Sequence, residues 1–139
     1  MAKAAIYTGL FDTKSITVKE FITHGERTYS INMNRVMSDP TLFDNITLLL
    51  ENLIKTKGIE YDRICATSVS AIPYATNIAT SVEKPIAWVV DNGNDRGVKG
   101  DIAGLKVEGG IEIDDRVLLV ETICTPDFYL ENVITRICK

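Results

Sequence analysis

This sequence has few of the residues that build metal sites, disulfide frameworks or nucleic-acid surfaces. It contains one histidine and three cysteines, and the spacing of Cys65, Cys124 and Cys138 is not that of metal ligands. Basic residues number 15 against 19 acidic ones, so the net charge is −4. With no basic patch and no apolar run of membrane-spanning length, neither nucleic acid nor a membrane is expected as a partner. An odd cysteine count without a secretory signal favours a reduced, cytoplasmic protein.

The rest of the composition is typical of a globular protein. Hydrophobic residues make up 45% and charged residues 24% of the 139 positions. That length predicts a single domain spanning residues 1–139 with a sizeable core. Cys65 and Cys124 lie next to apolar runs, which favours small core residues over reactive thiols.

The first 60 residues predict a hairpin and a long helix. A short helix is expected within Met1–Lys14, a half-buried strand over 15–21, and a second strand over 28–32 that pairs back across a turn. Asp39 and Pro40 have the residue types of a helix N-cap and first turn, and Gly58 suits the end of that helix. Between them, apolar residues recur at helical spacing: Leu42, Phe43, Ile46, Leu49, Leu50, Leu53 and Ile54.

The remainder alternates between strands and helices. Apolar runs at 61–66, 85–90 and 116–121 predict buried strands, and 70–81 and 127–138 predict helices. Residues 91–97 form a polar loop, and the glycine-rich 98–110 predicts short strands or a flexible hairpin. This order predicts an α/β fold with a mostly parallel central sheet, flanking helices and an N-terminal β-hairpin.

Two strand–loop–helix units contain the candidate binding residues. A loop that leads into a helix presents backbone N–H groups to an anion. The candidates for phosphate or ribose binding are Thr67, Ser68 and Ser70 after the first strand, and Glu121, Thr122 and Thr125 after the third. Four of them have a structural alternative: Ser68, Ser70 and Thr125 are suitable helix N-caps, and Glu121 suits equally a strand-end carboxylate that is solvated or bonded to backbone.

Several of these segments, taken in order, resemble orotate phosphoribosyltransferases. The matching segments are Thr8–Asp12, Phe21–Asn32, Ser38–Pro40, Gly58–Cys65, Ala71–Thr76, Lys84–Pro85 and Arg116–Glu121. The resemblance implies a phosphoribosyltransferase fold, a homodimer, and the joining of orotate to phosphoribosyl pyrophosphate (PRPP) with magnesium.

The sequence departs from the family at the residues that carry its chemistry. The family places two acidic residues after the third strand, but here Thr122 follows Glu121. Pro126 and Asp127 stand where small residues and a glycine would wrap a phosphate. The loop that is basic in the family has only Arg96 and Lys99 as basic residues. Each lost charge-assisted contact is worth roughly 2–4 kcal/mol, so catalysis is expected to be impaired.

Three functional hypotheses follow. The first is an impaired orotate phosphoribosyltransferase-like protein that acts as a binding or regulatory module. The second is an active enzyme that uses altered residues and Mg²⁺. The third is a nucleotide- or anion-binding protein of unrelated role. Because the family continues for further strands, one sheet edge or face is expected to be open to a partner, either a second copy or a paralogous subunit.

Overall fold

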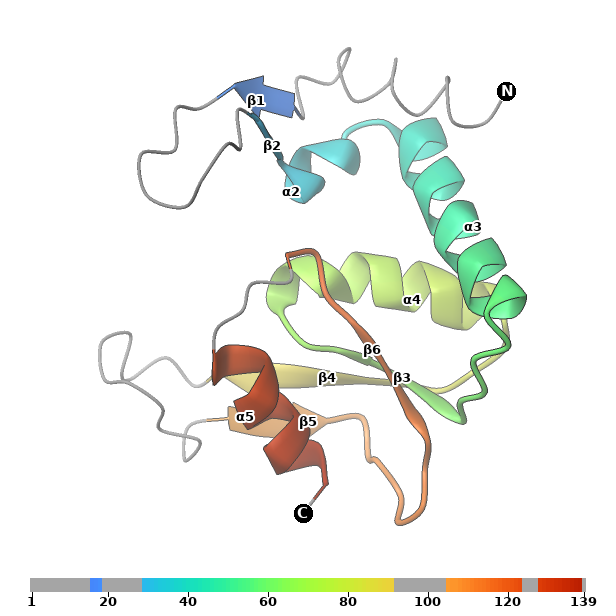
Figure 1. Ribbon diagram of the computed structural model, residues 1–139, viewed down its shortest axis with the longest axis vertical. Helices are drawn as coiled ribbons and strands as arrows, with labels where there is room; N and C mark the ends of the chain where they lie inside the picture. Colours follow the sequence, from blue (N-terminus) through green and yellow to red (C-terminus); the bar gives the residue numbers. More distant parts are fainter. Residues whose placement is uncertain (1–15, 19–28, 92–104, 124–127, 139) are drawn as a thin grey trace. The chain divides into compact units, whose positions relative to one another are not determined.

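A computed structural model describes residues 16–18, 29–91, 105–123 and 128–138. Its contacts divide the chain into two compact units, Met1–Lys57 and Gly58–Lys139. The elements of both are labelled in Figure 1. The short helix predicted for residues 1–14 and the polar loop after residue 91 lie outside the described residues.

The first unit contains the predicted hairpin and long helix. Strands β1 (Ile16–Val18) and β2 (Tyr29–Ile31) pair antiparallel, followed by the short helix α2 (Met33–Val36) and by α3 (Pro40–Thr56). The Asp39 carboxylate caps α3 as predicted, accepting the N–H groups of Thr41 at 3.0 Å and Leu42 at 3.1 Å. Helix α2 was not predicted, because its four residues are too few for a helical period to show.

The second unit is built on a four-stranded sheet with the order β5-β4-β3-β6 (Figure 1). Strand β3 (Arg63–Ala66) pairs parallel with both β4 (Ile86–Asp91) and β6 (Val117–Val120), while β5 (Leu105–Glu108) pairs antiparallel with β4. A 3₁₀ turn, η1 (Val69–Ala71), leads into α4 (Ile72–Ser81), and α5 (Phe128–Ile137) follows β6. The predicted α/β fold with a mostly parallel sheet is therefore confirmed.

The core of this unit surrounds its central strand. All four residues of β3 are buried, and Cys65 packs in a cluster with Ala87, Val89, Leu105 and Val133. Burial raises the pKa of the Cys65 thiol to about 11, so the thiol stays protonated at neutral pH. The prediction that Cys65 is a core residue is confirmed, and Cys124, for which the same was predicted, lies outside the described residues.

An ion pair joins the N-terminal ends of β3 and β6. Arg63 Nε lies 2.7 Å from Asp115 Oδ2, and Arg63 Nη1 donates to the Gly109 carbonyl at 3.2 Å. Only 11% of the Arg63 side chain and 17% of the Asp115 side chain are exposed. Asp115 Oδ2 also accepts the Glu112 N–H at 3.0 Å, so the pair fixes the turn between β5 and β6.

We expect Arg63→Met to lower the urea midpoint of unfolding, because it leaves the largely buried Asp115 carboxylate without its cation. Arg116→Met is the matched control, since Arg116 binds Asp62 and Glu60 with 54% of its own side chain exposed. Exposed ion pairs contribute little, so the control should shift the midpoint much less. Equal shifts of the two variants would show that the Arg63 pair has no special structural role.

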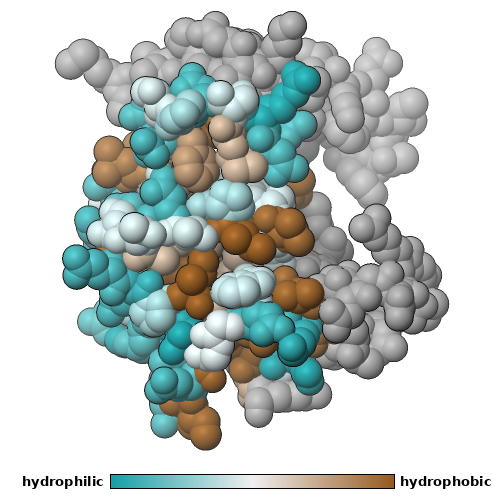
Figure 2. Space-filling model, turned by 180° about the vertical axis from the view of Figure 1, so that it is seen from behind, coloured by the Kyte–Doolittle hydropathy of each residue, from teal (hydrophilic) through white to brown (hydrophobic). Residues whose placement is uncertain are grey.

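Apolar side chains also reach the surface of the molecule. Figure 2 shows hydrophobic patches between hydrophilic side chains on the face opposite to the view of Figure 1. Ile113 is the extreme case, with 95% of its surface exposed. Among the described residues, no helix is long and apolar enough to cross a membrane.

Candidate functional site

The candidate site lies where the neighbouring strands β3 and β6 end. The two strands are parallel, so the loops that follow them leave the same edge of the sheet. A hydrogen bond from the Thr67 N–H to the Val120 carbonyl, 3.1 Å long, extends the pairing into these loops. It brings Thr67 and Ser68 beside Glu121 and Thr122, as expected of two adjacent strand–loop–helix units.

The Glu121 carboxylate is the centre of this cluster. Its Oε2 accepts the Thr67 hydroxyl at 2.6 Å. Its Oε1 accepts the Ser68 hydroxyl at 2.7 Å, and the N–H and hydroxyl of Thr122 at 2.6 and 3.1 Å. One carboxylate thus takes donors from both loops and ties them together.

The remaining hydroxyl links the two loops a second time. Ser70 Oγ lies 2.8 Å from Thr122 Oγ1 and 3.1 Å from Ser68 Oγ. Each hydroxyl has one proton to donate. The Ser68 and Thr122 hydroxyls donate their protons to Glu121. The Ser70 hydroxyl therefore does not donate to the carboxylate.

These hydrogen bonds keep Glu121 ionised. Burial opposes the charged form of this carboxylate, but the donors from Thr67, Ser68 and Thr122 outweigh burial and lower its pKa below the ordinary 4.5. At neutral pH the cluster is therefore a negative charge surrounded by hydroxyl groups. Such an arrangement suits neutral hydroxyl groups or cations better than a phosphate.

The lowered pKa makes stability depend on Glu121 in acid. The stabilising contribution is complete above the ordinary pKa of 4.5 and is lost as the pH falls through the lower folded-state value. We expect the urea midpoint of the wild type to fall more steeply below pH 4.5 than that of Glu121→Gln. Parallel pH profiles for the two proteins would contradict the carboxylate's role.

The structure contradicts the interpretation of Ser68 and Ser70 as helix-capping side chains. Ser68 precedes η1 without making a side-chain capping bond, and the residue that precedes α4 is Ala71. Ser68 thus occupies the N-cap position of η1 and Ser70 lies within η1, but neither side chain makes a capping bond, and both hydroxyls belong to the Glu121 network instead. The other candidates, Thr125, Arg96 and Lys99, lie outside the described residues.

The cluster does not fit a magnesium ion held by the protein. Glu121 is the one carboxylate in it, and both of its oxygens already accept protein donors. Within the described ranges, no group of three or more histidine, cysteine or acidic residues could hold a metal. Any Mg²⁺ at this site would have to arrive with its ligand.

Comparison with known proteins identifies the relationship. The chain is 33% identical over 117 residues to orotate phosphoribosyltransferase from Thermococcus kodakarensis, covering 83% of this chain and 60% of the relative. It is 29% identical over 126 residues to the Thermococcus gammatolerans enzyme of the same name, covering 89% and 64%. The chain is thus similar in sequence to orotate phosphoribosyltransferases.

Solved structures agree with the fold of the chain. The crystal structure of orotate phosphoribosyltransferase from Aeropyrum pernix aligns with a TM-score of 0.66 at 16% identity, covering 91% of this chain and 69% of that one. No family model matches the sequence. The chain spans about three fifths of the length of the curated relatives named above.

Sequence reasoning missed the partners of Glu121 and the Arg63–Asp115 pair. Both sets join segments more than 50 positions apart, so no local pattern contains them. A signal does exist in the parallel pairing. Arg63 begins β3 and Asp115 precedes β6, so an acid and a base lie at the same end of two paired strands. At the other end, Thr67 and Ser68 follow β3 and Glu121 follows β6.

Proposed function

We propose that this chain is a catalytically impaired orotate phosphoribosyltransferase-like protein that acts as a binding or regulatory module in pyrimidine nucleotide metabolism in the cytoplasm. The relationship to the named enzymes supports the pyrimidine theme. The observation that carries the impairment is the Glu121 carboxylate, which accepts the Thr67 and Ser68 hydroxyls at 2.6 and 2.7 Å.

Those hydroxyls would otherwise be available to a phosphate. To donate to a ligand, Thr67 and Ser68 would have to withdraw their protons from an ionised carboxylate. A hydrogen bond to a charged group contributes about 1.5–3 kcal/mol, so the exchange gives little net gain. The loop is thus engaged within the protein before any ligand arrives.

The charge of Glu121 adds a second cost. A phosphate that accepts from Ser68 would lie about 5 Å from the carboxylate, where two like charges repel by about 3 kcal/mol at an effective dielectric constant near 20. Enzymes that transfer phosphoribosyl groups need the opposite field around a departing pyrophosphate. The family uses two adjacent carboxylates to recognise ribose. This chain has Thr122 in place of the second acid, so Glu121 is the one carboxylate left at that position.

The proposal is tested by titrating the folded protein with PRPP, UMP and orotate, each with Mg²⁺, and by following orotate consumption in the same sample. We expect no orotate consumption and weak or absent heat with PRPP. Turnover of orotate with PRPP would make the chain an active enzyme and overturn the proposal. Saturable binding of UMP or orotate without turnover would support the binding module directly.

A partner protein is part of this proposal. A regulatory module must contact something that it regulates, either a second copy of itself or a paralogous subunit with an intact site. Sedimentation of the pure chain, alone and mixed with an active orotate phosphoribosyltransferase, would detect either association. A strictly monomeric chain that leaves the activity and affinities of the enzyme unchanged would contradict the regulatory part.

A further inference from the structure

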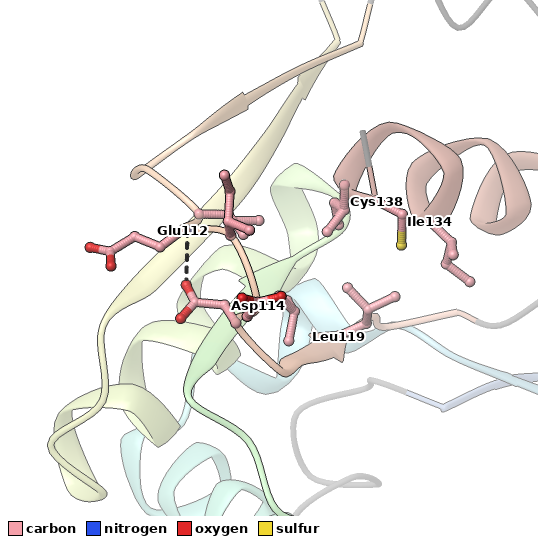
Figure 3. A pocket seen from close by; sticks show the side chains of 10 residues that line it. Glu112, Asp114, Leu119, Ile134 and Cys138 are labelled. Atoms are coloured by element: carbon pink, nitrogen blue, oxygen red, sulfur yellow. Dashed lines mark hydrogen bonds between the residues drawn. The ribbon is translucent and has the colours of Figure 1, made fainter.

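A groove lies on the second unit, away from the Glu121 cluster. It has a volume of about 570 Å³ and is lined by the turn between β5 and β6, by β6 itself and by the end of α5. In Figure 3, Leu119 of β6 lies toward Ile134 of α5 and toward Cys138, which follows that helix, and the Glu112 carboxylate points away from them. The groove therefore has an apolar part and an acidic end.

Strand β6 forms the edge of the described sheet. Its pairing with β3 shows which of its backbone N–H and carbonyl groups point outward. The carbonyls of Arg116 and Val120 accept N–H groups from the β3 side. Because backbone groups alternate sides along a strand, those of Val117 and Leu119 point away from β3, toward the open edge. All four residues of β6 are partly exposed, whereas all four of β3 are buried.

The same two residues line the groove. Val117 and Leu119 present their side chains to it, together with Ile134 and Ile137 of α5. An extended segment that bonded to their N–H and carbonyl groups would place every second side chain on this apolar surface. Edge hydrogen bonds and apolar contacts thus point to the same kind of occupant.

The acidic end specifies the charge of that occupant. Glu112 and Asp114 are exposed, and neither carboxylate has an ion-pair partner within the part of the chain that the structure describes. Asp115, the third acid of the turn, is held by Arg63. A lysine or arginine at one end of the added segment would meet this charge.

A second copy of the chain matches this edge poorly. Symmetric antiparallel pairing of β6 centred on Leu118 would set Asp115 opposite Glu121 of the other copy, with Asp114 close by. Like charges directly opposite each other destabilise a strand pair. A parallel arrangement of two copies does not form a closed dimer.

We propose that this groove binds an extended segment of another protein, in which apolar residues alternate with polar ones and a basic residue lies at the end. The segment adds as a strand beside β6. Its apolar side chains cover Val117, Leu119 and Ile134, and its basic residue binds the turn at Glu112 and Asp114. This surface shares no residue with the Glu121 cluster, so the inference does not depend on the function proposed there.

The test uses the full chain and a fluorescent synthetic peptide, Lys-Val-Thr-Ile-Thr-Val-Lys, followed by anisotropy. Its two lysines allow either strand direction. Two control peptides isolate the contributions: one with glutamate in place of both lysines, and one of the same composition without alternation, Lys-Val-Val-Ile-Thr-Thr-Lys. We expect the first peptide to bind about ten-fold more tightly than either control, with an affinity that falls as salt is added.

Two variants assign the binding to the groove. Ile134→Asp puts a charge on the apolar part and should weaken the peptide about ten-fold or more. Leu48→Asp, at a similarly exposed leucine of α3, should leave binding unchanged. Glu112→Lys combined with Asp114→Lys should reverse the preference toward the glutamate peptide.

Hydrogen exchange provides a readout of strand addition itself. The amide protons of Val117 and Leu119 should be protected by the peptide, while that of Leu118, which faces β3, should change little. Equal binding of all three peptides, or no binding by the folded protein at millimolar peptide, would overturn the proposal. Dimerisation that Ile134→Asp abolishes would assign the groove to a second copy and also overturn it.

Discussion

The Gly109→Ala variant is expected to lose about 2–5 kcal/mol of stability. Gly109 has φ +90°, where an L side chain is strained by about 1–2 kcal/mol. An added Cβ would lie 2.5 Å from the Ile86 carbonyl oxygen and 2.8 Å from Ala87 Cα. These are backbone atoms of β4, inside the sheet, so relieving the overlap costs about another 1–3 kcal/mol. Urea denaturation followed by circular dichroism measures the loss.

The neighbouring Gly110→Ala is the matched control. Gly110 also has a positive φ, +59°, but a Cβ there would meet no atom within 4 Å. Its cost should be the conformational strain alone, about 1 kcal/mol. If both variants lost the same stability, the close approach of Gly109 to β4 would not be a constraint on this fold.

The Glu121→Gln variant is expected to bind UMP more tightly than the wild type, by about ten-fold to a hundred-fold. The substitution removes the charge that repels a phosphate and keeps the shape of the side chain. It also frees hydroxyls, because an amide has one acceptor oxygen where the carboxylate has two. In an enzyme that uses this acid to hold ribose, the same change would weaken the ligand. Calorimetric titration with UMP separates the two expectations by sign.

Net charge must be controlled in that comparison. Glu112→Gln changes the total charge by the same amount as Glu121→Gln. Glu112 is an exposed carboxylate in the turn between β5 and β6, outside the Glu121 cluster. We expect its UMP affinity to match the wild type. Tighter binding by both variants would indicate a general charge effect, and weaker binding by Glu121→Gln would support ribose recognition instead.

Local sequence patterns predicted much of the fold. Strands β3, β4 and β6, the helix that begins at Pro40 and its Asp39 cap were predictable, because each is encoded within a few neighbouring residues. The predicted burial was wrong for β6, whose four residues are all partly exposed. The parallel pairing of β3 with β4 and β6 followed from the alternation of strands and helices. Helix α2 was missed because one turn carries no period.

The chemistry of the site was only partly predictable. The sequence placed Thr67, Ser68 and Glu121 at strand ends, and parallel pairing implied that they approach each other. It could not reveal that the carboxylate takes the hydroxyl protons, since this depends on side-chain geometry across more than 50 positions. For the same reason helix capping was the wrong interpretation for Ser68 and Ser70.

The most direct test of the central claim is an NMR titration of the Glu121 carboxyl carbon, with and without UMP. The account predicts a pKa below the ordinary 4.5. It also predicts that bound UMP raises this pKa, because the phosphate that Glu121 repels destabilises the charged carboxylate in turn. A pKa at or above the ordinary value without UMP, or one that saturating UMP lowers, would show that Glu121 does not hold the loop hydroxyls against a ligand.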